Sequence, residues 1–385
     1  MSKKEKDIQI NKPLEKFGVY DGSAVFIGAY IVMLLLQFLL YIVLTITKVP
    51  VGEAENAFDK TVAYACIVVA INEVAFLVAP FLYSKIKNRK VYLGCGLAER
   101  VKPTYLLLAA ATGLLCLFAF GPVSTLVNSL FANIGFSASV SPSATTVGEF
   151  IAYVVISAIV PGFCEEFLFR GHVQRGFTGR GYLFGLLTSS LLFAIMHGSP
   201  VQLVYQFFVG AMCGLLYIFT RSLWTSVIAH FTSNLAVLVL DFSLTSAGVN
   251  YVTVTGELVG IYAGVTVAGI ALLVGAMYLL YRLAAKKRDL YGELKQIKGA
   301  SPKAWNARLT LLGQTDEERA KAKEEQAFRL SQIEGAATPE IKEMLIQRYE
   351  SEDKKLNKMD TRGIILCFAI PGVIFILNTI LGFVQ

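Results

Sequence analysis

Long apolar stretches recur along the chain and alternate with short polar connections. Each stretch is long enough for a helix to cross a bilayer core of about 30 Å. We predict nine spanning helices, over residues 24–47, 61–84, 104–131, 147–178, 182–198, 201–220, 223–242, 256–281 and 363–384. The pattern therefore predicts an all-α polytopic membrane protein, a bundle of about eight or nine transmembrane helices.

One segment departs from this pattern. Residues 286–362 are rich in Lys, Glu, Arg, Asp and Gln, and opposite charges alternate at helical spacing over 315–334, as on a solvated helix. Pro302 and the stretch 335–340 resemble breaks between helices. We expect a charged cytoplasmic insert of two or three helices, which is either a solvated spacer or a docking site for a cytoplasmic partner.

The charge distribution indicates topology rather than a nucleic-acid partner. Of the 385 residues, 55% are hydrophobic and 16% charged, with a formal net charge of +7; this composition is not that of an ordinary soluble protein. Basic residues gather before the first span and after alternate spans, at Lys3, Lys4, Lys6, Lys12, Lys16, Lys85, Lys87, Arg89, Lys90, Arg100, Lys102, Arg175, Arg180, Arg221, Arg282 and Lys286–Arg288. This alternation satisfies the positive-inside rule for a multi-pass protein of the cell membrane with a cytoplasmic N-terminus.

The sequence indicates neither a cleavable signal peptide nor a structural role for paired cysteines. The first twenty residues are polar and show no cleavable signal peptide. The six cysteines lie mostly inside predicted spans and form no CxxC pair. We therefore expect neither a disulfide framework nor a zinc site built from cysteines.

Ionisable residues inside a membrane span are costly and are functional candidates. They are Glu73, Glu149, Glu165, Glu166, Arg170, His197 and His230, with Asn234 as a polar companion. For Glu73 we favour a buried carboxylate that bonds a neighbouring helix over a member of an ion path with Glu149. His172 lies nearer the cytoplasmic end, where we expect a cavity-mouth or interfacial residue.

Helical geometry separates the two adjacent glutamates. Glu166 and Arg170 are four residues apart, so they share a helix face and can pair. Glu165 points about 100° away from Glu166 and has no counter-ion on its own helix. Glu165 is therefore available as a general base, although a structural Glu–Arg pair with one spare carboxylate is the alternative.

Three helices deliver polar groups to similar depths. Counted at 1.5 Å per residue from the cytoplasmic ends of their spans, Glu165 lies about 15 Å deep, His230 about 13 Å and His197 about 20 Å. Phe193 lies four residues before His197, and Asn234 lies four residues after His230. The first spacing stacks a ring near one imidazole, and the second turns an imidazole and an amide the same way.

A carboxylate, two imidazoles and an amide inside a membrane suggest hydrolysis. Glu165 would activate a water with help from an imidazole, and His230 and Asn234 would donate hydrogen bonds to the developing oxyanion. A zinc ion held by Glu165, His197 and His230 is the alternative. Side-chain types alone do not choose between the two.

The three motifs together resemble a known family. EEFLFR (165–170), FAIMH (193–197) and HFTSN (230–234) are similar to the EExxxR, FxxxH and HxxxN motifs of the CPBP family. This family comprises intramembrane proteases, including type II CAAX prenyl endopeptidases, and bacteriocin-processing or immunity proteins. The resemblance covers about residues 145–240 and implies an endopeptidase with a cytoplasm-facing cavity inside the bilayer.

The resemblance also implies roles and a division of the chain. Glu165 would activate water with the help of His197, His230 and Asn234 would form the oxyanion site, and Glu166 and Arg170 would support the geometry; we favour a metal-free mechanism. The substrate would be a membrane-associated peptide or protein. The expected parts are a cytoplasmic segment (1–23), N-terminal spans (24–144), the catalytic core (145–242), an eighth span (243–285), the insert (286–362) and a last span (363–385).

Two alternatives to a protease remain at this point. The first is a non-catalytic protein of the same fold, such as a bacteriocin-immunity or scaffold protein. The second is a transporter or channel that uses Glu73 and Glu149. Transporters often carry paired broken helices from inverted repeats, and we find no internal repeat in the sequence.

Overall fold

The computed structural model describes residues 17–52, 57–88, 90, 92, 94–137, 141–249 and 256–384, except for the side chains of 256–257 and 352–357. Every regular element in these ranges is helical, which confirms the all-α prediction. The elements are α2 (Val19–Ile46), η1 (Phe58–Lys60), α3 (Val62–Ile86), α4 (Pro103–Asn133), α5 (Val147–Tyr153), η2 (Val154–Ile159), α6 (Val160–Leu168), η3 (Phe169–Gln174), α7 (Arg175–Phe177), η4 (Thr178–Arg180), α8 (Tyr182–Met196), α9 (Leu203–Thr220), α10 (Leu223–Ser246), α11 (Gly256–Lys287), α12 (Tyr291–Gln296), α13 (Pro302–Gly313), α14 (Asp316–Glu334) and α15 (Pro339–Val384).

Eight helices in the described ranges are long and apolar enough to cross a membrane. They coincide with eight of the nine predicted spans, so the chain is a multi-pass membrane protein. The remaining predicted span, residues 182–198, is the fifth along the chain and corresponds to α8, which has 15 residues. At 1.5 Å per residue α8 is about 22 Å long, shorter than a bilayer core of about 30 Å.

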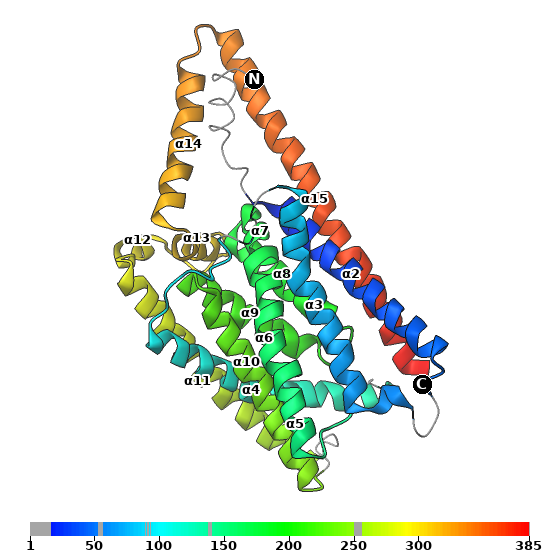
Figure 1. Cartoon of the computed structure of the whole chain (residues 1–385). Helices are drawn as coiled ribbons and strands as arrows, with labels where there is room; N and C mark the ends of the chain where they lie inside the picture. Colours follow the sequence, from blue (N-terminus) through cyan, green and yellow to red (C-terminus); the bar gives the residue numbers. More distant parts are fainter. Residues whose placement is uncertain are drawn as a thin grey trace.

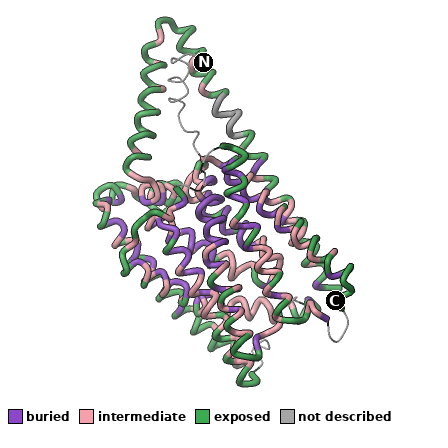
Figure 2. The backbone as a smooth tube through the Cα atoms, in the orientation of Figure 1, coloured by how far each residue is buried: buried purple, intermediate pink, exposed green. Residues whose placement is uncertain are grey.

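The fourth span lies at the centre of the bundle (Figure 1). Its middle part, α6, packs against α3 and α10, while α2 contacts α3 and α15, and α4 contacts α10 and α11. Buried residues concentrate in the centre, and exposed ones lie on the outer helices (Figure 2). The outer helices expose large apolar side chains such as Leu35, Phe38 and Leu377, as expected of surfaces that face lipid.

The fourth span is a composite helix, Val147–Arg180. Two of its segments, η2 and η3, are π-helical, and short π-helical segments occur often at functional sites. Pro161, the second residue of α6, lies two residues after the end of η2. It has no backbone N–H, so the carbonyl of Ser157 has no α-helical donor four residues later. The irregular segment η2 therefore lies directly before α6, the part of the span that carries Glu165 and Glu166.

Short polar residues set the starts of several helices. Side-chain oxygens of Thr61, Thr146, Ser222, Ser301 and Thr315 each accept a hydrogen bond from a backbone N–H in the first turn of the following helix. Such N-caps satisfy donors that have no partner within the helix. The caps at Thr61 and Ser222 fix the starts of α3 and α10, two helices that carry site residues.

The charged insert contains α12, α13, α14 and the first part of α15, one helix more than the upper expectation. Helices α14 and α15 form a hairpin that projects from one end of the bundle (Figure 1). Helix α15 has 46 residues, about 69 Å at 1.5 Å per residue, and continues without a break into the last span. Helix α13 lies against the bundle, where the Asn306 side chain accepts a hydrogen bond from the backbone N–H of Leu183.

Candidate active site

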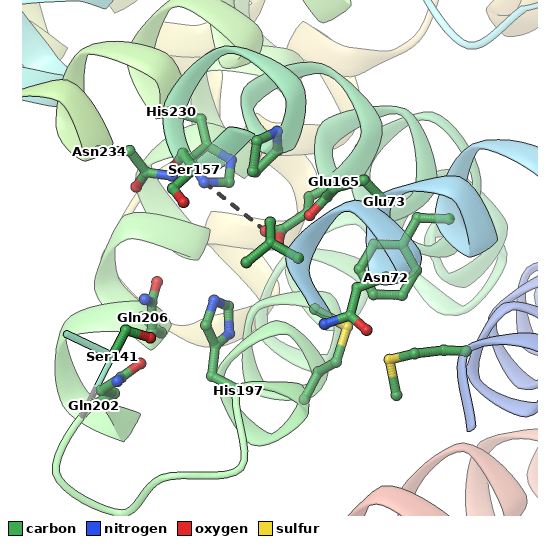
Figure 3. Close-up of a pocket in the computed structure, with 15 residues that line it drawn as sticks. Asn72, Glu73, Ser141, Ser157, Glu165, His197, Gln202, Gln206, His230 and Asn234 are labelled. Carbon is green, nitrogen blue, oxygen red and sulfur yellow. Dashed lines mark hydrogen bonds and ion pairs between the residues drawn. The ribbon is translucent and has the colours of Figure 1, made fainter. Parts of the chain in front are cut away.

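A cavity of about 340 Å³ lies inside the bundle. It is lined from α2, α3, η2, α6, α8, α9, α10 and the loop before α5, and Figure 3 shows these side chains converging on it. Four of the predicted site residues line it, namely Glu165, His197, His230 and Asn234. The two others, Glu166 and Arg170, lie fully buried behind it.

Glu166 and Arg170 form the ion pair that their spacing predicted. Arg170 Nη1 lies 2.6 Å from Glu166 Oε1, and neither side chain is exposed. The second guanidinium nitrogen donates to the carbonyl of Gly210 at 2.7 Å, and the guanidinium lies over the ring of Phe193 at 4.9 Å. The pair thus ties α6 and η3 to α8 and α9.

Glu166 also binds His230, which sequence spacing did not reveal. His230 Nδ1 lies 2.8 Å from Glu166 Oε1. A carboxylate paired with Arg170 can only accept hydrogen bonds, so Nδ1 carries the hydrogen and donates it. The other ring nitrogen, Nε2, is then presented to the cavity, 3.8 Å from Glu165 Oε2.

The close approach of α6 and α10 has a local cause. A Cβ atom at Gly162 would lie 3.3 Å from the backbone and Cβ atoms of Phe231. Glycine therefore allows the two helices to meet one turn before Glu166 and beside His230. The aromatic ring of Phe193 completes the packing, edge-on to His230 at 5.6 Å and to His197 at 4.9 Å, and the second of these contacts was predicted.

Glu165 points into the cavity (Figure 3), whereas Glu166 does not line it, so the two carboxylates diverge as helical geometry predicted. Its side chain is largely buried, with 8% exposed. Oε2 of Glu165 has no hydrogen-bond partner among the described residues, and its distance from His230 is too long for a hydrogen bond. A buried, unsatisfied carboxylate oxygen is costly, and here it faces open space.

Glu73 of α3 is the neighbour of Glu165 that the sequence did not identify. Its side chain is 2% exposed, it lines the same cavity, and its carboxyl lies within hydrogen-bonding reach of the Glu165 carboxyl. The preferred expectation, a buried carboxylate that contacts a neighbouring helix, gave the right kind of environment. It did not identify the contacted residue, which is Glu165, the candidate general base.

His197 lies across the cavity from Glu165 (Figure 3). It is the C-cap of α8, and its Nδ1 donates to the carbonyl of Phe193 at 2.7 Å. No hydrogen bond or ion pair joins His197 to Glu165 within the described part of the chain. The imidazole in contact with Glu165 belongs to His230 instead.

Asn234 lines the cavity one turn beyond His230. Its amide nitrogen donates to the carbonyl of Ser157 at 3.0 Å. That carbonyl is available because Pro161 supplies no N–H to it. The proline in α6 and the asparagine in α10 are therefore two parts of one local arrangement.

The expectation for His172 was wrong. His172 is fully buried, its Nδ1 donates to the carbonyl of Phe167 at 2.8 Å, and it does not line the cavity. His172 lies seven residues after Glu165, a spacing that would put both side chains on one face of a regular α-helix. The π-helical segment η3 changes the helical register, so this spacing no longer places His172 on the face of Glu165. Glu149 is partly exposed and caps α5 through Thr145 and Thr146, which explains it without the ion path that the sequence left as the less favoured alternative.

The rest of the lining combines apolar and neutral polar side chains. The apolar ones are Met33, Val69, Phe76, Pro161 and Met196, and the polar ones are Asn72, Ser141, Ser157, Gln202 and Gln206. Gln202 and Gln206 are four residues apart at the start of an apolar span, a signal of a shared polar face that was available in the sequence. Asn72 accepts a hydrogen bond from Gln37 at 2.8 Å.

The residues proposed for zinc are not arranged as a ligand set. Among the described residues, no group of three His, Cys, Asp or Glu side chains is placed to hold a metal ion. His230 Nε2 lies 3.8 Å from Glu165 Oε2, whereas no hydrogen bond or ion pair joins His197 to either residue in the described part of the chain. The alternative with Glu165, His197 and His230 around zinc does not fit this arrangement, so we derive no step through a metal.

Comparison with known proteins supports the motif-based resemblance. Residues 147–236 match the sequence model of the Rce1-like family, described as type II CAAX prenyl endopeptidase Rce1-like. The matched range contains all three motifs, and Glu73 lies outside it. No curated protein and no solved structure matched the chain.

Proposed function

We propose, from the membership of residues 147–236 in the family of Rce1-like type II CAAX prenyl endopeptidases, that the chain is an intramembrane endopeptidase. Its substrate is a membrane-associated peptide or protein. The observation that carries the proposal is the pair formed by Glu165 and His230. An unsatisfied carboxylate oxygen faces an imidazole nitrogen at 3.8 Å in a polar cavity inside the bundle.

Glu165 acts as the general base of the reaction. Its free oxygen accepts a proton from a water as the water oxygen bonds to the scissile carbonyl carbon. When the carbon–nitrogen bond breaks, the same carboxyl returns that proton to the leaving amine. The buried position serves this role because few other groups compete for its oxygen.

His230 and Asn234 stabilise the oxyanion. Asn234 gives one amide hydrogen to Ser157 and keeps a second one for the substrate. His230 donates to the oxyanion from Nε2 in the doubly protonated form of the ring, in which Nδ1 keeps its hydrogen bond to Glu166. Donors held in place before the reaction are usually the largest catalytic contribution.

Glu73 positions Glu165. A hydrogen bond between two carboxyl groups requires that one of them keeps a proton, and two ionised carboxylates in contact would repel each other. We assign the proton to Glu73, which then donates to Glu165 and leaves a single negative charge on the base. His197 approaches the substrate or the water from the opposite wall of the cavity.

The test uses purified full-length protein in detergent and a library of peptide substrates. Glu165→Gln and His230→Ala should each abolish cleavage while the thermal unfolding midpoint stays close to that of the wild type. Glu149→Gln makes the same Glu-to-Gln change at the start of α5, outside the cavity, and this control should cleave normally. Full activity of Glu165→Gln would contradict the role assigned to Glu165, whereas absence of cleavage by the wild type as well would favour the non-catalytic alternative of the same fold.

A further inference from the structure

The cavity has a buried end and an open end. Glu73, Glu165 and His230 at one end are buried, whereas Ser141 and Gln202 at the other are exposed. In Figure 3 these two side chains lie together on the side of the cavity away from Glu165 and Glu73. We call this open end, formed by Ser141 and Gln202, the mouth.

The chain direction shows which end of the bundle the mouth faces. Helix α4 starts beside Lys102 and ends at Asn133, and the composite fourth span then returns from Val147 to Arg175 and Arg180. The loop that carries Ser141 therefore lies at the end opposite those basic residues. Tyr153 donates to the carbonyl of Pro142 at 2.7 Å, which holds this loop against the bundle.

Gln202 lies in the other loop of the mouth, between α8 and α9. Helix α8 starts just after Arg180, and α9 ends just before Arg221, so this loop also points away from the basic end. Because α8 spans only about 22 Å, the loop stops within the bundle. The short helix thus leaves room that the cavity occupies.

Charge identifies the two ends. The end with Lys102, Arg175, Arg180 and Arg221 also carries the charged insert, whose α14–α15 hairpin projects from it (Figure 1). The connections at the other end include 132–146 and 243–255, which contain no charged residue. By the positive-inside rule the basic end is cytoplasmic.

We infer that the mouth opens on the non-cytoplasmic face of the membrane, and that the substrate enters as an uncharged, extended peptide segment from that face. This inference rests on the proposed function of the cavity. It reverses the cytoplasm-facing orientation that the family resemblance implied. Candidate substrates are exported peptides and the outer ends of membrane proteins.

The lining near the mouth fits such a segment. Asn72, Ser141, Gln202 and Gln206 present neutral amide and hydroxyl groups, each able to donate or accept hydrogen bonds. An extended peptide needs partners for its backbone N–H and C=O groups when it leaves water. Among the described residues, no charged side chain lines the cavity beyond Glu73, Glu165 and the two histidines, so the part near the mouth offers no partner for a charged substrate residue.

Cysteine labelling in intact cells tests the orientation. Cys66 is the native cysteine that is partly exposed, and the other five are buried, so the background is Cys66→Ser. Burial also raises the pKa of the Cys95 thiol in the loop between α3 and α4, which lowers its thiolate fraction and its reactivity. Ser141→Cys and Gln202→Cys report on the mouth, and Lys321→Cys in exposed α14 reports on the insert.

A membrane-impermeant maleimide should label both mouth cysteines in intact cells, and Lys321→Cys only after permeabilisation. Mouth cysteines that react only after permeabilisation, or not at all, would overturn the inference. So would labelling of Lys321→Cys in intact cells. Labelling needs no catalysis, so a protein that labels as expected but cleaves nothing would refute the proposed function and leave the orientation standing.

Discussion

His230 Nδ1 donates to Glu166 Oε1 across 2.8 Å, although the two residues are 64 positions apart. The same oxygen accepts Arg170 at 2.6 Å. Glu166 is therefore both a counter-ion within its own composite helix and the group that orients an imidazole on α10. One carboxylate couples the stability of the core to the geometry of the site.

Loss of this carboxylate should lower stability. Glu166→Gln leaves Arg170 buried without a counter-charge, and breaking a buried pair in this way costs about 3–5 kcal/mol. We expect a lower thermal unfolding midpoint for purified protein in detergent. Glu149→Gln, which removes a charge at a partly exposed position outside the cavity, should shift the midpoint far less.

A double variant separates the two roles of Glu166. Glu166→Gln with Arg170→Met removes both buried charges, and such replacements are often neutral or stabilising. Stability should return while cleavage stays low, because His230 has lost its orienting carboxylate. Recovery of full activity in the double variant would show that the contact between Glu166 and His230 is dispensable.

Glu165→Gln should act on the chemical step. The substitution keeps the size of a side chain whose free oxygen makes no hydrogen bond to the described residues, so folding should be unaffected. Loss of a general base lowers kcat by about 10²- to 10⁴-fold. Steady-state kinetics should show this fall with little change in KM, and a large rise in KM at normal kcat would assign Glu165 to substrate binding instead.

Glu73 should tolerate one substitution and not another. In Glu73→Gln the amide still donates a hydrogen bond to Glu165, so kcat should stay within about tenfold of the wild type. Glu73→Ala removes the donor, and misplacement of a catalytic group by about 1 Å can cost about 10²-fold. Equal activity of the Gln and Ala variants would show that the hydrogen bond to Glu165 has no role.

The sequence predicted the elements of this protein better than their contacts. Long apolar runs located eight spanning helices because a bilayer core fixes the length of each helix. The pair Glu166–Arg170 and the contact Phe193–His197 were predictable because both depend on a spacing of four within one helix. The contact of His230 with Glu166 and of Glu73 with Glu165 depends on how separate helices pack, which no local pattern encodes.

Irregular helix geometry caused the clearest error. The position of His172 was extrapolated from Glu165 with a regular α-helical period, and η3 breaks that period between them. Counting along the helices predicted similar depths for Glu165, His197 and His230, and all three line one cavity. The location of the mouth could not be predicted in this way. The location of the mouth depends on the short length of α8 and on the conformation of the loop that carries Ser141. A hydropathy pattern does not describe the conformation of such a loop.

Chelation should leave activity unchanged. The described residues provide no group of three His, Cys, Asp or Glu side chains placed for a metal, and the proposed steps use only protein groups and water. We expect equal cleavage rates before and after treatment with 1,10-phenanthroline and dialysis. Loss of activity that returns with added zinc would revive the ligand set Glu165, His197 and His230.

Pro161 should control Asn234 through the backbone. Pro161→Ala restores an N–H that can bond the carbonyl of Ser157, the acceptor that now holds Asn234 at 3.0 Å. Removing an oxyanion donor costs about 10²- to 10³-fold in kcat, so we expect a fall of this size in Asn234→Ala and a smaller one in Pro161→Ala. Pro122→Ala makes the same change inside α4, away from the cavity, and should leave kcat unchanged. A normal kcat for Pro161→Ala beside a low one for Asn234→Ala would show that Asn234 keeps its position without the free carbonyl.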